Sequence, residues 1–383
     1  MWNIINYLSM LDFPFTQGSF TLGLYCFSFF LILVVFNFSA CTNLNIPYNY
    51  SSGKRLLFLF GVAVFAITCF INGDFYHYQE MVHSYDFSEW ASNHGEPVYG
   101  YIIQLVNRNY LLFRIVVWGG ALFLVSKLVS QLGLEDYKVV FYLLSSYILT
   151  FSYARATLAF SIYYLGVVFC VAPNNRSLLK RVIGIALILI SYSFHHSLII
   201  AIAITPIIFI PFNKRTILLV FILIPIIFGL FSNLINSVLV SGEFLDNEEL
   251  ASQISFYAER STEAINWKGK IYEWSNFATF FVPLIIVTYY SYFKNKIVFP
   301  FYIEAFFKIA FSLILFAVMF LFLDIEGKVF FYRVLFMTFI PLSIIVYYTA
   351  FYGIIKRKMY LFLLLLGLSA QLYRFIYSMY LYI

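Results

Sequence analysis

The stretch FYIEAFFKIAFSLILFAVMFLFL, residues 301–323, decides the structural class of this protein. It contains two charged residues, Glu304 and Lys308, in an otherwise strongly apolar run. An α-helix needs about 20 predominantly apolar residues to cross the hydrocarbon core of a bilayer. Glu304 and Lys308 are four residues apart with the acid first, the order that favours an ion pair along a helix. The stretch therefore predicts a transmembrane helix with one internal ion pair.

Similar apolar runs recur along the whole chain, which is 62% hydrophobic and 11% charged. Soluble domains contain about 25% charged residues, so this composition excludes a soluble protein. We expect an all-α, polytopic integral membrane protein with about twelve transmembrane helices, forming a single transmembrane domain over residues 1–383. The predicted spans are residues 19–37, 55–72, 109–128, 139–152, 156–172, 180–194, 196–211, 215–238, 275–293, 301–323, 329–350 and 358–380.

The charges between these spans predict the topology. Fourteen of the 24 basic residues fall in every second connection: Lys54, Arg55, Lys127, Lys138, Arg176, Lys180, Arg181, Lys214, Arg215, Lys294, Lys296, Lys356, Arg357 and Lys358. The positive-inside rule assigns these connections to the cytoplasm and both termini to the opposite side. Fifteen of the 18 acidic residues lie in the other gaps. The first eighteen residues contain Asp12 but no Lys or Arg, so we expect no cleavable signal peptide.

Two long loops, residues 73–108 and 239–274, are predicted on the extracytoplasmic side. Both mix aromatic and charged residues, which is typical of helices lying on a membrane surface. The cytoplasmic connections are short and lack a nucleotide-binding loop, and Glu135, Asp136 and Lys138 form what we interpret as a solvated turn in one of them. The four cysteines show no paired spacing that would predict a disulfide or a metal site. A transporter and a membrane transferase with lipid-carried substrates both fit this pattern.

Arginine residues on the predicted outer side are the strongest candidates for a binding site. Arg155 opens one predicted span, Arg333 lies near the start of another, and Arg114 and Arg374 lie inside spans. Arg108 precedes a span. An ionised side chain at membrane depth is costly and usually faces a cavity or a partner. The guanidinium fork suits phosphate oxygens, so converging arginines predict a diphosphate pocket. The alternative is that they extend to lipid headgroups or pair with acids of the loops.

Two kinds of residue could handle a proton near this pocket. Asp74 lies where the second span emerges, and a carboxylate there could accept a proton from a sugar hydroxyl. His195 and His196 lie in a tight turn between two spans, where an imidazole could act as a general base near neutral pH. Adjacent histidines point in different directions, so we expect at most one to face the cavity, and we favour His195. The alternative for Asp74 is a helix cap or an ion pair with an arginine.

The order of these motifs resembles the EpsG-like branch of bacterial polysaccharide polymerases, which are similar to the Wzy O-antigen polymerases. The matching motifs are Asp74, Tyr78 and Glu96-Pro97-x-Tyr99, then Ala154-Arg155-Ala156-Thr157-Leu158-Ala159, then Phe194-His195-His196-Ser197, then Tyr332-Arg333. The resemblance covers roughly residues 55–350. The chain departs from the family pattern at Ala156, where the family usually has Gln after the arginine.

The resemblance implies a GT-C-like membrane glycosyltransferase that needs no metal or cofactor and binds no nucleic acid. It would transfer a growing glycan from undecaprenyl diphosphate to the next lipid-linked repeat unit, on the outer face of the bacterial cytoplasmic (inner) membrane. Arg155 and Arg333, with Arg108 or Arg114, would hold the diphosphate, and His195 or Asp74 would be the catalytic base. Sugar-binding positions would be Tyr78, Glu96, His196 and Tyr332. Partners would be membrane lipids and a chain-length-regulating co-polymerase, and the product O-antigen, capsule or exopolysaccharide.

Three alternatives share some of these features. A flippase for the same lipid-linked unit would also have about twelve spans and a cationic cavity. Such transporters often show internal repeats and comparable loops on both sides, and this sequence shows neither. A ligase of the O-antigen type would use similar arginines and a histidine, and a membrane O-acyltransferase is a further alternative. The one-sided loops favour a transferase over a flippase.

Overall fold

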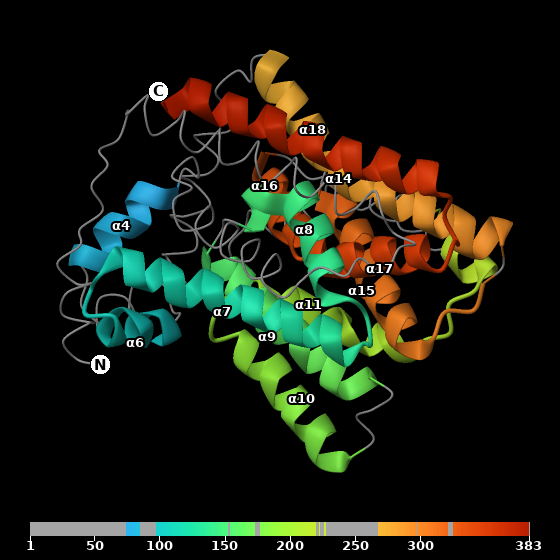
Figure 1. Ribbon diagram of the computed structural model, residues 1–383, viewed down its shortest axis with the longest axis horizontal. Coiled ribbons are helices and arrows are strands. Elements are labelled where there is room, and N and C mark those ends of the chain that lie inside the picture. The colour runs from blue at the N-terminus through green and yellow to red at the C-terminus, as the bar shows by residue number, and fades with distance from the viewer. Residues whose placement is uncertain are drawn as a thin grey trace. The chain divides into compact units, whose positions relative to one another are not determined.

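The structure is a computed structural model that describes residues 74–84, 97–151, 154–172, 177–219, 222, 226, 267–295, 297–320 and 325–382. Every regular element in these ranges is a helix (Figure 1). The predicted spans at residues 19–37 and 55–72 lie outside the described residues, as does most of the span at 215–238. Two compact units are distinguished along the chain, Met1–Ile202 with Val346–Ile383 and Ala203–Ile345.

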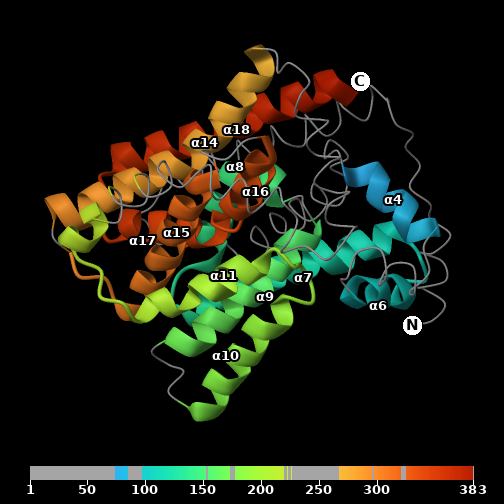
Figure 2. The same cartoon turned by 180° about the vertical axis from the view of Figure 1, so that it is seen from behind.

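The first unit is organised around helix α9 (Ala154–Val171), which packs against α7 (Tyr110–Gln131) and α10 (Leu178–Ser191) (Figures 1 and 2). Residues 157–168 of α9 are all buried, as expected for a helix that is apolar on every face and covered by neighbours. Two shorter helices lie near the start of α7. They are α4 (Asp74–Ser84) and α6 (Pro97–Leu105).

Glycines allow α9 and α10 to approach closely. A Cβ atom added to Gly184 would lie 2.7 Å from the carbonyl oxygen of Gly166, and one added to Gly166 would lie 2.7 Å from the carbonyl oxygen of Gly184. Small residues at such crossings let helix backbones meet within a membrane, where packing rather than the hydrophobic effect holds helices together. The Gly166–Gly184 crossing therefore sets the separation of these two helices.

A second helix pair completes the first unit. Helix α18 (Arg357–Tyr382) packs against α8 (Asp136–Phe151), with Gly367 opposite Ser146 and the rings of Tyr360 and Tyr142 5.7 Å apart. Helix α8 is kinked at Tyr147, whose backbone angles, φ −139° and ψ 21°, are not helical.

The second unit centres on helix α15 (Phe301–Phe320), which packs against α16 (Ile325–Phe336) and the 3₁₀-helix η1 (Thr205–Phe209). The Phe307 ring of α15 lies within 6.3 Å of four other rings, those of Phe212, Tyr292, Phe299 and Phe311. Helix α14 (Trp267–Thr288) continues directly into the π-helix η2 (Tyr289–Lys294).

The predicted ion pair in this unit is confirmed. Lys308 Nζ lies 2.9 Å from Glu304 Oε1 and also donates a hydrogen bond of 3.0 Å to the carbonyl oxygen of Ile208 in η1. Because Lys308 is only 3% exposed, both acceptors compensate the cost of burying its charge. Glu304 therefore neutralises the charge of Lys308, and the hydrogen bond from Lys308 to Ile208 joins α15 to η1.

The described helices match the predicted spans closely. Within the described part of the chain, three segments are long and apolar enough to cross a membrane, Tyr110–Gln131, Trp274–Lys294 and Phe301–Val318. Three shorter apolar helices, Lys138–Ile148, Arg155–Val171 and Leu198–Phe209, coincide with further predicted spans, and a fourth, Phe339–Phe351, covers the second half of the span predicted at residues 329–350. These helices confirm the all-α class for the described residues and support an integral membrane protein, whereas the count of twelve spans and the GT-C-like arrangement stay predictions.

Some boundaries differ from the prediction. The single span expected at residues 329–350 is two helices, α16 and α17 (Phe339–Phe351), because the chain turns at Met337 and Thr338. The span expected at residues 275–293 agrees with the apolar segment Trp274–Lys294, but its helix, α14, begins earlier, at Trp267. Lys138 was expected in a solvated turn but is buried, with its Nζ 2.6 Å from Glu135 Oε2. Hydropathy averages over windows and does not resolve one-turn breaks or the burial of a single lysine.

Candidate functional site

Arg155 lies in the first turn of α9, as the sequence predicts, and contacts Tyr78 of α4. Its Nε and Nη2 atoms both donate to the Tyr78 hydroxyl oxygen, at 2.9 and 2.7 Å. The guanidinium carbon lies 4.8 Å from the centre of the Tyr78 ring. The edge of the guanidinium that commonly chelates two phosphate oxygens therefore grips a single phenol oxygen. Tyr78 fixes the orientation of Arg155, whose side chain is partly exposed.

Tyr99 of α6 connects this arginine to the other motifs. Its hydroxyl donates a 2.6 Å hydrogen bond to the carbonyl oxygen of Arg155. Its fully buried ring packs edge-on against Phe113 of α7 and Phe194 of the turn after α10, with centroid distances of 6.2 and 5.9 Å. Pro97 begins α6, a position where its missing N–H costs no hydrogen bond, and it places Tyr99 within the first turn.

The two histidines of the turn after α10 point in different directions, as expected. The His195 ring lies 6.1 Å from Phe160, which is on α9 five residues after Arg155. The His196 ring instead stacks on Tyr192 at 4.8 Å. His195 is therefore the one packed against the helix that presents Arg155, and its neighbour Phe194 touches Tyr99. This agrees with the preference for His195 over His196 as the candidate base, a role that stays a prediction.

Arg114 is buried and contacts two aromatic residues of its own helix. Its side chain is 1% exposed, its Nη1 donates to the Tyr110 hydroxyl at 3.1 Å, and its guanidinium carbon lies 4.0 Å from the centre of the Trp118 ring. Stacking on a tryptophan and bonding to a phenol offset part of the cost of burying the charge. The described contacts do not bring Arg114 to the Tyr78–Arg155 pair.

Arg374 is also buried, within the pair formed by α18 and α8. It is 1% exposed, and its Nη1 donates to Thr150 Oγ1 at 3.3 Å. Thr150 lies in the last turn of α8, just past the kink at Tyr147. Arg374 thus joins two helices that are far apart in the sequence.

The remaining predicted residues lie elsewhere. Arg108 is exposed between α6 and α7, with Asn107 and Arg108 both in the left-handed region at φ 52° and 56°. Arg333 lies in the last turn of α16, not near the start of a span as expected, and the ring of Tyr332 packs against Phe331 and Phe336. Tyr332 and Arg333 belong to the second unit and Arg155 to the first, so the convergence of Tyr332 and Arg333 with Arg155 stays a prediction.

Asp74 is described only in its backbone, and Glu96 is not among the described residues. Asp74 is the first residue of α4, one helical turn before Tyr78, and its side chain lies outside the described residues. Glu96 also lies outside the described residues. The catalytic role of Asp74 and the sugar-binding role of Glu96 stay predictions.

Four segments thus meet at one end of α9: α4 through Tyr78, α6 through Tyr99, α9 through Arg155, and the turn after α10 through Phe194. We call these four residues and His195 the arginine cluster. Its chemistry is a fixed guanidinium at the start of a helix, where the backbone dipole also favours an anion. The Tyr78 phenol lies at that cation, and the His195 imidazole packs on Phe160 of the same helix. The cluster can therefore bind a phosphate oxygen and place hydrogen-bonding groups beside it.

Sequence reasoning missed three residues that hold arginines in place. Tyr99 was quoted in a motif but received no role, because its partner is a backbone carbonyl 56 residues away. Tyr110 and Trp118 stand four residues before and four after Arg114, which places all three on one helix face. That spacing was a usable signal for an aromatic clamp.

The comparison with protein families identifies the group to which the chain belongs. A model of the EpsG family matches residues 54–382. The chain belongs to the EpsG family. The match includes every residue of the arginine cluster, so the motif order that suggested an EpsG-like protein is confirmed at the level of the family. Comparisons with curated proteins and with solved structures returned no match. Membership of the EpsG family suggests a glycosyltransferase-like polysaccharide polymerase in a membrane.

Proposed function

We propose that this EpsG-family protein is a polysaccharide polymerase that acts on lipid-diphosphate-linked glycans. The observation that carries the proposal is the fixing of Arg155 by Tyr78 and Tyr99, which come from two different segments of the first long loop. A positioned guanidinium at the start of a membrane helix suits a diphosphate better than a neutral sugar. Family membership supports polymerisation as the reaction class.

The proposed reaction is a glycosyl transfer without a nucleotide. A hydroxyl of the acceptor repeat unit attacks the anomeric carbon of the donor glycan, and the bond from that carbon to the diphosphate oxygen breaks. Undecaprenyl diphosphate leaves with the bonding electrons, and the hydroxyl proton passes to a base. Stabilising the charge that develops on the diphosphate is the main catalytic device in such a step. Arg155 would supply it, with Arg333, Arg108 or Arg114 as further predicted contributors.

The roles of the other residues follow from their positions. Tyr78 orients Arg155. When a phosphate oxygen binds, it would accept hydrogen bonds from the Arg155 guanidinium beside the Tyr78 hydroxyl or in its place. His195 or Asp74 would accept the proton, since His195 packs on the helix of Arg155 and Asp74 lies one turn before Tyr78. Glu96, His196 and Tyr332 remain proposed sugar contacts. The site would face the exterior of the cytoplasmic membrane, where a co-polymerase would regulate chain length.

A reconstitution experiment tests the proposal. The purified protein is placed in liposomes with the lipid-linked repeat unit extracted from a strain of the source organism that lacks this protein, without nucleotide. We expect a ladder of longer lipid-linked products. Movement of unmodified lipid across the bilayer without a ladder would indicate a flippase instead.

An Arg-to-Lys pair of variants then tests the site. Arg155→Lys keeps the charge but loses the planar fork, so we expect the ladder to fall by about a hundredfold at unchanged protein level. The matched control is Arg181→Lys on the exposed start of α10, which should give a normal ladder. A normal ladder from Arg155→Lys would refute the assignment of Arg155.

A further inference from the structure

Two apolar grooves flank one short basic segment of the second unit, residues 212–218, which contains Lys214 and Arg215. The first groove has a volume of about 510 Å³ and is lined by η1, α15 and the segment itself, including Ile207, Phe212, Thr216, Ser312, Leu315 and Phe316. The chain leaves α11 (Leu198–Ile204) and tightens into η1 at Pro206, and Phe212 after η1 packs on Phe307 and Phe311 of α15. Buried Lys308 holds the η1 carbonyl of Ile208 and so fixes this wall.

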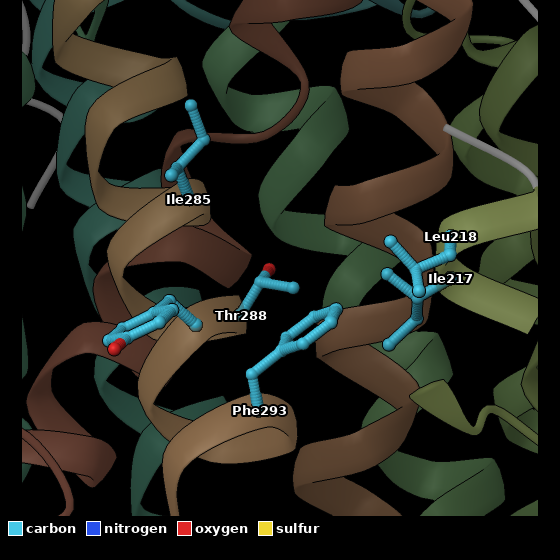
Figure 3. A pocket seen from close by; sticks show the side chains of 6 residues that line it. Ile217, Leu218, Ile285, Thr288 and Phe293 are labelled. Carbon is cyan, nitrogen blue, oxygen red and sulfur yellow. The ribbon is translucent and has the colours of Figure 1, made fainter. Parts of the chain in front are cut away.

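The second groove has a volume of about 230 Å³ and lies between the same segment and the end of α14 (Figure 3). Ile217 and Leu218 face Ile285, Thr288 and Phe293 across it in the close view. Tyr289 and Phe293 belong to the π-helix η2. A π-helical turn changes the direction of side chains along a helix and is frequent at functional sites. The wider turn therefore shapes one wall of this groove.

Cations lie between and beside the two grooves. Lys214 and Arg215 are exposed on the segment that supplies Phe212 and Thr216 to the first groove and Ile217 and Leu218 to the second. Asn213 caps this segment, its Oδ1 accepting the Thr216 N–H at 2.9 Å. Lys214 Nζ lies 5.1 Å from the Phe293 ring centre, at the wall of the second groove.

A further lysine extends the positive charge along η2. Lys294 Nζ lies 4.7 Å from the Tyr290 ring centre, one residue beyond the groove-lining Phe293. Among the residues that the structure describes, those lining the two grooves include no acid. Glu304, the acid of α15, is engaged by Lys308. Basic residues beside apolar grooves match a ligand with one anionic group and long apolar chains.

We propose that this part of the second unit binds one anionic phospholipid, with its phosphate between Lys214 and Arg215 and its acyl chains in the two grooves. Charge complementarity argues for the headgroup, since a phosphate diester is negative and a zwitterionic headgroup is neutral overall. The apolar lining argues for the chains. The basic residues lie in predicted cytoplasmic connections, so the lipid belongs to the cytoplasmic leaflet. The site uses none of the residues of the arginine cluster and does not depend on the proposed polymerase reaction.

Native mass spectrometry and thermal unfolding in a neutral detergent test this proposal. The probes are dioleoyl phosphatidylglycerol, dioleoyl phosphatidylcholine and inorganic phosphate, each added separately. We expect one retained phosphatidylglycerol, at least tenfold tighter than phosphatidylcholine, together with a rise in Tm. Equal retention of both lipids would overturn the proposal. An equal rise in Tm with inorganic phosphate would show a phosphate site without a lipid.

Four variants locate the lipid. Lys214→Gln with Arg215→Gln should abolish the preference for phosphatidylglycerol. Lys214→Arg with Arg215→Lys keeps both charges and should keep the preference, which would show that substitution at these positions is not itself disruptive. Ser312→Phe, which fills the first groove without altering charge, should weaken lipid retention at least tenfold. The control, Lys180→Gln with Arg181→Gln, removes two exposed charges from α10 and should leave binding unchanged. A loss as large in this control as in the Lys214 pair would refute the site.

Discussion

At the scale of single residues, the arginines of this protein fall into distinct environments. Arg155 is partly exposed and oriented by a phenol, whereas Arg114 and Arg374 are buried and held by aromatic or hydroxyl groups. An arginine that binds substrate must expose some of its N–H groups, whereas an arginine that joins helices directs its N–H groups to acceptors within the protein. This difference in exposure makes Arg155 the stronger candidate for diphosphate binding than Arg114.

The orientation of Arg155 predicts an effect of Tyr78. Tyr78→Phe removes the oxygen that accepts two hydrogen bonds from the guanidinium, and a hydrogen bond to a charged group is worth about 1.5–3 kcal/mol. We expect polymer formation to fall by about tenfold at normal protein level, measured as the ladder from reconstituted protein. Tyr101→Phe on the exposed face of α6 is the control and should retain activity. Equal ladders from both variants would show that the Tyr78 hydroxyl is dispensable.

The aromatic clamp on Arg114 predicts energetic coupling within α7. Arg114→Met and Trp118→Leu should each lower the unfolding free energy, and the double variant should lose less than the sum of the two. We expect a coupling of about 1 kcal/mol, because the cation and the ring stabilise each other only when both are present. Unfolding of the four proteins in detergent measures this. Strict additivity would mean that the 4.0 Å contact contributes no stability.

At the scale of helices, close packing depends on positions that have no side chain. The α9–α10 crossing depends on Gly166 and Gly184, and the α8–α18 contact depends on Gly367 against Ser146. Both crossings support the arginine-bearing helices, since α9 presents Arg155 and α18 carries Arg374. Substitutions at these glycines should therefore lower the stability of the protein, and should affect the arginine cluster only by displacing the helices that support it.

A pair of glycine substitutions tests this dependence. Gly184→Ala would place a Cβ atom 2.7 Å from a backbone oxygen that cannot rotate away, so the two helices must separate. We expect a loss of about 1–3 kcal/mol, seen as a Tm lower by several degrees in detergent. Gly119→Ala in α7 is the matched control, because nothing lies within 4 Å of its added Cβ atom. That variant should be neutral or slightly stabilised by its higher helix propensity.

At the scale of the whole molecule, the distribution of charge predicts how the chain crosses the membrane. The positive-inside prediction assigns Arg108 to the outer side and Lys356 to the cytoplasm. Both side chains are exposed on the surface of the protein. The proposed polymerase site and the proposed lipid site depend on this assignment, because one needs an outward face and the other a cytoplasmic leaflet.

Cysteine labelling tests the assignment. In a chain whose four native cysteines are replaced, Arg108→Cys should react with a membrane-impermeant maleimide in intact cells from which any outer barrier has been removed. Lys356→Cys should react only after the cytoplasmic membrane is permeabilised. The reverse pattern would invert the topology and remove the basis for an outward-facing site.

The amino-acid sequence was enough to predict the membrane class, the positions of most helices, the Glu304–Lys308 pair and the family to which the motifs point. These features depend on composition and on neighbours three or four residues apart, which helical geometry brings together regardless of the rest of the fold. It did not reveal the break at Met337 and Thr338, because hydropathy varies little across it.

The contacts between residues far apart in the sequence could be seen only in the folded structure. The hydrogen bonds from Arg155 to Tyr78 and from Arg374 to Thr150 join residues 77 and 224 positions apart. The two grooves beside Lys214 likewise arise where η1 and η2 depart from α-helical geometry. Such contacts depend on how helices pack at small residues and where their turns tighten or widen, and neither periodicity nor hydropathy encodes that packing.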